Sequence, residues 1–591
     1  MKTAHWGWRR NDKRDATLSD DNKKISSARL PEDWRPARHV FAFHEDTNAN
    51  AVLITSGGEI YAVAEERLTR KRFQAGFPQR SLAWITEASG VRLDEVDTLV
   101  FGNPTHFLPR VLGTHFPSFE HDMFGTVHKI MLTYHHLCFS VPAFAAFMKL
   151  VCRSLLRFRF KQQIVFVDHH DAHAASAYYT SGFKEACAVS ADNYGDGYAA
   201  KVFDCQGSEI KFVRGVSALN SPGQFYGEIA QIAGIHPLLA GKLTGMAASG
   251  NPDAAASEMK QLFDSISNDT NFTRTFGLRR SKNSDPFNRL AAVNKPDLAA
   301  SAQRRFEDTL TRFVRKAVRD TGRRHVALAG GSFANVRLNQ KILELPEVDS
   351  VWIHPAMTDQ GIAMGAALAH IAAQKHPLPF QFENILLGPA PTEDEMIAAL
   401  KKFDLAWERP EHVWKTAARL LADGKSLARF DGPMEYGLRA LGNRSILYRP
   451  DDPHVHDWLN KKLQRASYMP FAPMTMEPHA AKCYQNVEGA LEAARFMTIS
   501  FYATDWMKEK CPGVVHIDGT VRPQVLRASD NPGMYRILEE YYRLTGLPSV
   551  LNTSFNMHSE PIVATADDAC LAFKESELDH LVIGPFVAST R

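Results

Sequence analysis

The feature that most constrains the fold is a recurrence of short apolar runs separated by longer helical patterns. Two runs, Ala51–Ile54 and Ile60–Ala64, flank the pair Gly57-Gly58, which predicts a β-hairpin. Residues 75–160 show mainly the patterns of helices that cover a sheet. Strand clusters with intervening helices predict an α/β fold, and their repetition is compatible with an internal duplication. The other predicted strands are Val40–Phe43, Ile164–Val167, Ala186–Ala191, Gly197–Phe203, His325–Ala329 and Val351–His354.

A proline-rich stretch at Pro377–Pro391 separates this region from a second α/β unit that continues to Arg591. At 591 residues the chain is too long for a single hydrophobic core, so more than one unit is expected. The start of the chain carries many charges and no periodic apolar pattern. We therefore divide the sequence into a charged extension, 1–37, an N-terminal unit, 38–385, and a C-terminal unit, 386–591.

Composition argues against several classes of function. Lys and Arg total 69 against 66 for Asp and Glu, a net charge of +3, which gives no electrostatic reason to expect nucleic acid as the main partner. The seven cysteines are scattered without a C-x-x-C pair, as expected for reduced thiols in a cytoplasmic protein. The most apolar stretch, Leu137 to Val151, contains Pro142 and Lys149 and predicts one or two buried helices, with no membrane partner.

Two histidines directly follow the predicted strand Ile164–Val167. If a helix begins there, His169 and His173 lie one turn apart on the same face. Two imidazoles form half of a divalent-metal site and need further ligands, for which Asp192 and Asp359 at strand ends are candidates. Histidine pairs of this spacing also occur in cores and on surfaces, so the spacing alone leaves a structural role open.

Glycine-rich turns supply candidate sites for phosphate groups. Gly195-Asp196-Gly197 lies between two predicted strands, and Gly330-Gly331-Ser332 connects a strand to a helix whose exposed amides favour an anion. Gly241-Lys242 adds a cation to a third turn. Each of these segments is compatible with a simple turn. No complete P-loop is present, and Asp423-Gly424-Lys425-Ser426 is interpreted as a helix-ending turn.

Taken in order, these segments resemble the O-carbamoyltransferases of nodulation and antibiotic biosynthesis. The resemblance spans roughly residues 38–585, and its many co-ordered motifs are more specific than any one of them. The motifs are His44 with Asp46–Ala49, Ala64–Lys71, His169–His173, Asp192, Gly195–Gly197, Gly241-Lys242, Gly330-Gly331, Asn335, Asp359–Gly361, Glu435–Leu447, Pro470–Pro473, His516–Thr520, Arg522, Gln524, Asn552–Asn556 and Glu560-Pro561.

The resemblance implies an actin/hexokinase-like, Kae-type N-terminal domain and a YrdC-like α/β C-terminal domain. It implies that the C-terminal domain converts carbamoyl phosphate and ATP, with Mg, into carbamoyladenylate. The N-terminal domain would then transfer the carbamoyl group to a hydroxyl of a small-molecule acceptor, such as a sugar, an antibiotic, a toxin or another natural product. It also implies that His169, His173, Asp192 and Asp359 hold a divalent metal, most simply iron, with manganese or zinc as alternatives.

The same resemblance assigns residues to the two halves of the reaction. His44 is the expected general base, because an imidazole titrates near neutral pH, and its structural alternative is capping the hairpin loop. The adenylate would be bound in the N-terminal domain by Asn193, Gly195, Asp196, Gly197, Lys242, Gly330, Gly331 and Asn335. Carbamoyl phosphate and ATP would be bound in the C-terminal domain by Arg439, Asn443, Arg444, Ser445, His516, Arg522, Asn552, Ser554 and Asn556.

The sequence departs from the family pattern at two places. The segment Arg465–Met469 lacks a glutamate and an arginine that many members carry, and Ala240 stands where an acidic residue often precedes Gly-Lys. These departures suggest another acceptor or altered activation chemistry. Two alternatives therefore stay open: a tRNA-modifying threonylcarbamoyl transferase and a non-catalytic nucleotide-binding relative. The acceptor and the oligomeric state are not predicted.

Overall fold

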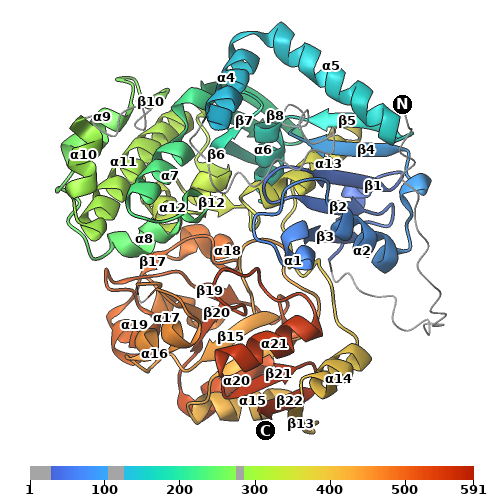
Figure 1. The fold of residues 1–591 in the computed structure, drawn as a ribbon, viewed down its shortest axis with the longest axis vertical. Coiled ribbons are helices and arrows are strands. Elements are labelled where there is room, and N and C mark those ends of the chain that lie inside the picture. Colours follow the sequence, from blue (N-terminus) through green and yellow to red (C-terminus); the bar gives the residue numbers. More distant parts are fainter. Residues whose placement is uncertain (1–27, 104–125, 275–284, 467, 591) are drawn as a thin grey trace.

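The computed structural model describes residues 28–103, 126–274, 285–466 and 468–590, which form two α/β units (Figure 1). The N-terminal unit contains two five-stranded sheets of the same strand order. The first has the order β3-β2-β1-β4-β5 and the second β8-β7-β6-β11-β12. Their strands are β1 Val40–His44, β2 Asn50–Ile54, β3 Ile60–Ala64, β4 Thr98–Gly102, β5 Gln163–Val167, β6 Glu185–Gly195, β7 Tyr198–Gln206, β8 Glu209–Ser217, β11 His325–Ala329 and β12 Ser350–Ile353.

Each sheet joins an antiparallel meander to two parallel strands. In the first sheet β1 pairs antiparallel with β2 and parallel with β4, and in the second β6 pairs antiparallel with β7 and parallel with β11. This repetition confirms the duplicated α/β pattern and the predicted actin/hexokinase-like architecture. The hairpin at Gly57-Gly58 is also confirmed by the β2–β3 pairing. Strand β4 lies inside the region predicted to be helical, and β8 was not predicted, because neither has a strong apolar alternation.

Two helices, α6 (His169–Tyr179) and α13 (Ile362–Lys375), pack against each other between the two sheets (Figure 1). Helix α13 contacts β1 and β4 of the first sheet, whereas α6 contacts β6 and β11 of the second. The two sheets therefore meet where α6 begins. The other helices of this unit are α1 Glu65–Thr69, α2 Gln79–Ser89, α4 Thr126–Ser140, α5 Pro142–Arg159, α7 Pro222–Ile232, α8 Lys242–Ala247, α9 Ala256–Leu262, α10 Asp285–Ala292, α11 Lys295–Thr321 and α12 Val336–Leu343.

The C-terminal unit is built on an eight-stranded mixed sheet of order β13-β22-β21-β14-β15-β20-β16-β19. Helices α15 and α20 cover one face of this sheet through a separate apolar cluster. The strands are β13 Leu405–Glu408, β14 Leu427–Phe430, β15 Arg444–Tyr448, β16 Ala472–Met476, β19 Gln524–Leu526, β20 Ser549–Ser554, β21 His580–Ile583 and β22 Phe586–Thr590. The helices are α14 Glu393–Lys402, α15 Val413–Ala422, α16 Val455–Lys462, α17 Ala480–Cys483, α18 Leu491–Ala494, α19 Asp505–Lys510, α20 Pro532–Thr545 and α21 Ala566–Ser576. Two short ladders, β9 Phe263–Ser265 with β10 Phe272–Arg274 and β17 Phe501–Tyr502 with β18 Thr520–Val521, complete the described strands.

Part of the predicted N-terminal extension belongs to the packed structure. Trp34 is fully buried, and its indole nitrogen donates to the Leu378 carbonyl at 2.6 Å. Its ring also contacts Tyr179 and Phe380. The interpretation of residues 28–36 as a charged arm is therefore corrected, because apolar side chains anchor them. Residues 1–27 lie outside the described part of the chain.

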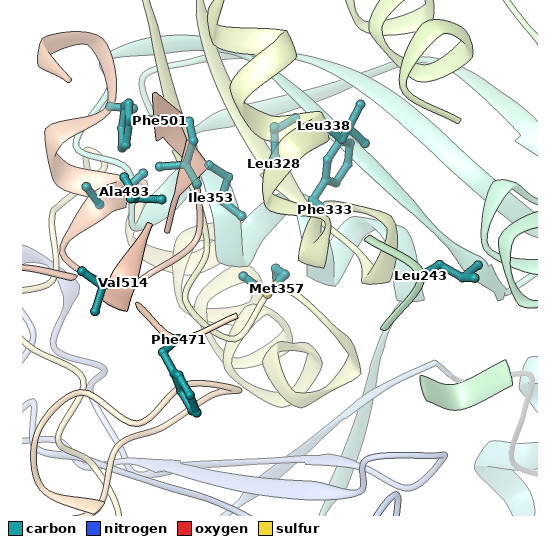
Figure 2. Packing of buried hydrophobic residues seen from close by; sticks show 14 of the residues in the cluster. Leu243, Leu328, Phe333, Leu338, Ile353, Met357, Phe471, Ala493, Phe501 and Val514 are labelled. Atoms are coloured by element: carbon teal, nitrogen blue, oxygen red, sulfur yellow. The ribbon is translucent and has the colours of Figure 1, made fainter. Parts of the chain in front are cut away.

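A continuous apolar core joins the two units. One cluster of buried side chains contains residues of β11, β12 and α12 together with residues of the C-terminal unit. Figure 2 shows Leu328, Phe333, Leu338, Ile353 and Met357 on one side of this contact and Phe471, Ala493, Phe501 and Val514 on the other. Since the burial of apolar surface is the main stabilising term in packing, the units are held as one body.

No single described helix is long and apolar enough to cross a membrane, although Leu132–Ser140 and Pro142–Arg159 together meet the length and composition for a pair bent by 116°. The prediction that the stretch around Leu137–Val151 forms helices is confirmed by α4 and α5. The prediction that these helices are buried is only partly correct, because Phe147 and Leu150 are exposed.

Replacing Phe333 by Ala should lower the free energy of unfolding by about 3–5 kcal/mol, since the fully buried ring would leave a cavity in the shared core. Chemical denaturation measures this loss. Phe158→Ala is the matched control, because Phe158 is 91% exposed and its loss should change stability by less than about 0.5 kcal/mol. Equal losses for the two variants would contradict the description of this core.

Candidate active site

The four predicted metal ligands come from three elements that meet between the sheets. Strand β5 ends at Val167 and α6 begins at His169, so the first turn of α6 places His169 and His173 on one face. Asp192 lies near the end of β6, where the strand leaves its regular register. Asp359 begins the short turn that leads into α13. Residues far apart in sequence are therefore brought together by the packing of α6 against α13.

The ligand atoms of these four side chains all lie within 4.8 Å of one another. Asp192 Oδ2 is 3.1 Å from His173 Nε2 and 3.8 Å from His169 Nε2. Asp359 Oδ1 is 3.6 Å and 3.8 Å from the same two nitrogens. Donors that each lie about 2 Å from a shared ion are separated by about 3–4 Å, which matches this cluster. The cluster could hold one divalent ion.

Burial makes this cluster electrostatically demanding. Burial alone would raise the pKa of Asp192, but the imidazoles of His169 and His173 hold it well below its usual range. Burial and the charge of Asp192 raise the pKa of Asp359. Burial would lower the pKa of His173, yet the two carboxylates outweigh it and raise this pKa to about 9. A positive charge at the centre would allow both carboxylates to be ionised together.

Polar atoms without a hydrogen-bond partner also indicate that the cluster could bind a divalent ion. Four buried atoms make no hydrogen bond to any described residue: both ring nitrogens of His169, Nδ1 of His173 and Oδ1 of Asp359. Buried polar groups are normally hydrogen-bonded or bound to a metal, because their desolvation is otherwise not offset. Two imidazole nitrogens and two carboxylate oxygens suit iron, manganese or zinc. The residues present therefore fit the implied ion.

The loop Gly195–Gly197 supports His169 and lies outside the cavity. The Asp196 carboxylate accepts the backbone N–H of His169 at 2.7 Å. A Cβ at Gly195 would lie 2.1 Å from His169 Cγ, so only glycine leaves room for the imidazole. The predicted role of Gly195, Asp196 and Gly197 in binding the adenylate is corrected, because the loop faces the histidine.

The second glycine turn supports Asp192. The amide of Gly331 donates to Asp192 Oδ2 at 2.9 Å and lines the cavity, as predicted for a residue of the site. Gly330 has a φ of 105° and passes so close to Ala191 that a Cβ would lie 2.2 Å from its carbonyl oxygen. Gly330 does not line the cavity, so its predicted contact with the adenylate is replaced by this close backbone approach.

His44 ends β1, and its side chain is fully buried beside the four-donor cluster. Its Nε2 lies 3.3 Å from the Thr47 carbonyl oxygen and 4.0 Å from Asp359 Oδ2. The first contact belongs to the hairpin loop and fits the structural alternative. The second places the imidazole next to a carboxylate of the four-donor cluster, as the predicted role of general base requires.

One cavity of about 680 Å³ extends from the cluster into the C-terminal unit. It is lined by both carboxylates of the cluster and by loops of both units. The predicted site residues that line it are Asp192, Asn193, Lys242, Gly331, Asn335, Asp359, Arg439, His516, Arg522, Ser554 and Asn556. The two predicted halves of the site therefore face the same space.

The C-terminal wall of this cavity is strongly basic. Arg439, Arg465 and Arg522 line it, and none of the three has a carboxylate within 4.0 Å among the described residues. Burial lowers the pKa of Arg439 and of Arg465 to about 10. Burial and the charges of Arg439 and Arg465 also lower the pKa of Arg522. A polyanion would stabilise partly buried guanidinium groups that repel one another. Phosphate suits this role, because guanidinium groups bind it through bidentate hydrogen bonds.

Four predicted residues of the C-terminal unit have structural roles instead. Arg444 is fully buried, and its guanidinium donates to the carbonyls of Asp431, Asn443, Pro389 and Gly432 at 2.8–3.1 Å. It therefore holds the loop that precedes β15 and cannot reach a phosphate. Asn443 accepts from Arg429 and Asn531, Ser445 accepts from the Gly442 amide, and Asn552 donates to Ala440 and Gln524. All four predictions of direct binding are corrected, because these side chains lie behind the cavity wall.

Several cavity residues were not predicted. Arg72, Gln224, Arg465 and His558 line the cavity, and the pKa values of Lys242 and His558 are lowered by burial and by nearby cations that include Arg72 and Arg465. The amide of Gln224 is buried, and neither its nitrogen nor its oxygen has a hydrogen-bond partner in the described structure. Arg465 stands in a segment that the sequence analysis noted only for its departures. No local signal distinguishes these side chains from surface residues.

Comparison with known proteins agrees with this geometry. Residues 40–368 match the family described as the carbamoyltransferase N-terminus, and residues 418–590 match the carbamoyltransferase C-terminus. The chain therefore belongs to the carbamoyltransferase family and is an enzyme of that class. The nodulation protein NolNO of Sinorhizobium fredii is 29% identical over 92% of this chain and 78% of its own length. The nodulation protein NolO of Bradyrhizobium diazoefficiens is 30% identical over 72% of this chain and 79% of its own length. Among solved structures, full-length HypF in its phosphate- and nucleotide-bound form has a TM-score of 0.35 at 12% identity and covers 59% of this chain and 56% of its own.

The two arginines of one loop should respond differently to substitution. Arg444→Met should lower the free energy of unfolding by about 3–5 kcal/mol, because it leaves buried carbonyls without donors. Arg439→Met should change it by less than about 1 kcal/mol, since Arg439 makes no hydrogen bond to a described residue. Thermal and chemical denaturation measure both. A loss at Arg439 as large as that at Arg444 would contradict its assignment to the cavity wall.

Proposed function

We propose that the chain is an ATP-dependent O-carbamoyltransferase. Water would cleave carbamoyl phosphate into carbamate and phosphate, and an oxygen of carbamate would displace pyrophosphate from the α-phosphorus of ATP to give carbamoyladenylate. The carbamoyl group would then pass to a hydroxyl of a small-molecule acceptor, with release of AMP. The observation that carries this proposal is the single cavity that has unpaired arginines on one wall and the four-donor cluster on the other.

The basic wall supports the activation step. Carbamoyl phosphate and ATP bring several negative charges into one space, and their mutual repulsion must be offset for them to react. Arg439 and Arg522 have guanidinium groups that no described carboxylate neutralises, and Arg465 is oriented by Thr553 and Ser554 at 2.7–3.2 Å. Their charges would neutralise the phosphates and hold the reacting oxygens in line. ATP would bring Mg with it.

The N-terminal wall supports the transfer step. An alkyl hydroxyl is a weak nucleophile, so a proton acceptor is needed as it attacks the carbamoyl carbon. We assign this role to His44, which lies next to Asp359. A divalent ion held by His169, His173, Asp192 and Asp359 would supply Lewis-acid stabilisation of negative charge at the adenylate.

A shared cavity also protects the intermediate. Carbamoyladenylate hydrolyses readily, and its passage from one wall of the cavity to the other without release would limit its loss to water. Asn193, Lys242 and Asn335 line this space beside the cluster and are placed to bind the nucleotide part of the intermediate. Ala240 and Met469, at which the sequence departs from the family pattern, also line the cavity. Their small or apolar side chains would influence which acceptor fits.

The seven described cysteines are all buried and free, which supports the proposed cytoplasmic location.

Pyrophosphate release from ATP should require carbamoyl phosphate, and Arg439→Met should reduce it by about 10²-fold or more because a phosphate contact is lost. A coupled pyrophosphate assay measures this. Arg536→Met is the matched control, since Arg536 is exposed on α20 of the same unit. Pyrophosphate release that ignores carbamoyl phosphate would contradict the proposal. Salt-sensitive binding of tRNA without any such release would favour the tRNA-modifying alternative.

His44→Ala should leave carbamoyl phosphate-dependent pyrophosphate release intact and slow transfer from supplied carbamoyladenylate by about 10²–10⁴-fold. The two rates are measured separately, with mass spectrometry of the carbamoylated product for the second. A purely structural role in the hairpin predicts that both rates fall together. His44→Gln, which keeps a hydrogen-bonding group near Thr47, should restore the fold and not the transfer.

A further inference from the structure

Helix α5 has an apolar surface on two opposite faces. Its inner face buries Cys152 and Leu156 in the cluster that contains β1, β4 and β5. Its outer face carries Phe147, Leu150 and Phe158, which are 59%, 59% and 91% exposed. Residues separated by three, eight or eleven positions share one side of a helix, so these three side chains form one stripe. We call this stripe the outer α5 face.

Neighbouring residues extend the apolar surface. Leu137 at the end of α4 and Val141 at the bend before α5 are 43% and 44% exposed. A contiguous exposed apolar surface of this kind is uncommon on soluble proteins and indicates a contact with another surface.

The charges that α4, α5 and the residues directly after α5 contribute beside this face all have one sign. The sequence from Thr126 to Lys161 contains no Asp or Glu, whereas Arg157, Arg159 and Lys161 follow the apolar stripe at its C-terminal end. Arg157 and Lys161 are exposed. Lys149, in the middle of the helix, is paired with Asp168 at 2.6 Å and so contributes little net charge. Asp94 and Asp97 of the neighbouring segment are paired with Arg92 and Arg38, so the free charge that α5 and Lys161 add to this surface is positive.

We propose that the outer α5 face docks on an anionic lipid surface, with α5 lying in the plane of the headgroups. The aromatic and aliphatic side chains would enter the acyl boundary, and the arginines and the lysine would contact the phosphates. A second copy of the chain fits this face less well, because two such surfaces would bring only like charges together. Figure 1 shows α5 at the edge of the N-terminal unit, far from the C-terminal unit, so docking would leave the cavity open to its substrates. This inference revises the sequence-based expectation of no membrane partner and is independent of the proposed reaction.

Co-sedimentation with vesicles of phosphatidylglycerol and phosphatidylcholine tests the proposal. The full chain should bind vesicles rich in phosphatidylglycerol and bind pure phosphatidylcholine at least about tenfold more weakly, with affinity falling as salt rises. Phe147→Glu with Leu150→Glu should abolish binding. Arg157→Glu with Lys161→Glu should weaken it by about tenfold or more, since both charges are reversed. Circular dichroism should show the same fold in all variants, because the four substituted side chains are all exposed: Phe147, Leu150, Arg157 and Lys161.

Leu571→Glu is the matched control, because Leu571 is 44% exposed on α21 of the C-terminal unit and should leave vesicle binding unchanged. Undiminished binding of the Phe147→Glu with Leu150→Glu variant to vesicles rich in phosphatidylglycerol would overturn the proposal. So would a dimer in lipid-free solution that the same substitutions dissociate, since the face would then contact a second copy. Absence of binding to phosphatidylglycerol would also overturn it.

Discussion

Two carboxylates buried beside two imidazoles are the constraint on which the rest of the structure depends. Asp192 and Asp359 lie so close together, and so largely buried, that both carry charge only if a cation or a protonated imidazole lies between them. The donors arise from α6, from β6 and from the turn before α13, so they meet only when both sheets pack on this helix pair. Loops such as Gly195–Gly197 are shaped to hold the ligands, which explains why they are rich in glycine.

The C-terminal wall of the cavity carries the opposite charge. Cations such as Arg439 and Arg522 face the same space as the carboxylates, and no described side chain neutralises them. A cavity with repelling cations on one side and carboxylates of the four-donor cluster on the other favours a ligand that carries phosphates at one end and a reactive group at the other. The apolar core that joins the units keeps the two walls opposed (Figure 2). The outer α5 face lies elsewhere, so docking and chemistry use separate surfaces.

Much of the fold and of the cluster could be predicted from local patterns. The hairpin at Gly57-Gly58 and the pair His169 and His173 follow from spacing alone, because the periods of strand and helix place side chains on known faces. The different roles of the arginines in the C-terminal loop could not be predicted. Arg439 and Arg444 stand in one glycine-flanked segment with the same chemistry, yet one faces the cavity and the other is enclosed by carbonyl oxygens.

The sequence by itself determined which groups are available: two imidazoles one turn apart, carboxylates at strand ends, and arginines in glycine-flanked loops. It also determined the family, through the order of its motifs. Only the tertiary structure decided which of these groups share a space, because that depends on contacts between distant segments and on burial. The same reason explains why Arg72 and Arg465 were not predicted and why Phe158 was not recognised as exposed. Local periodicity specifies the face of an element, whereas packing specifies what that face meets.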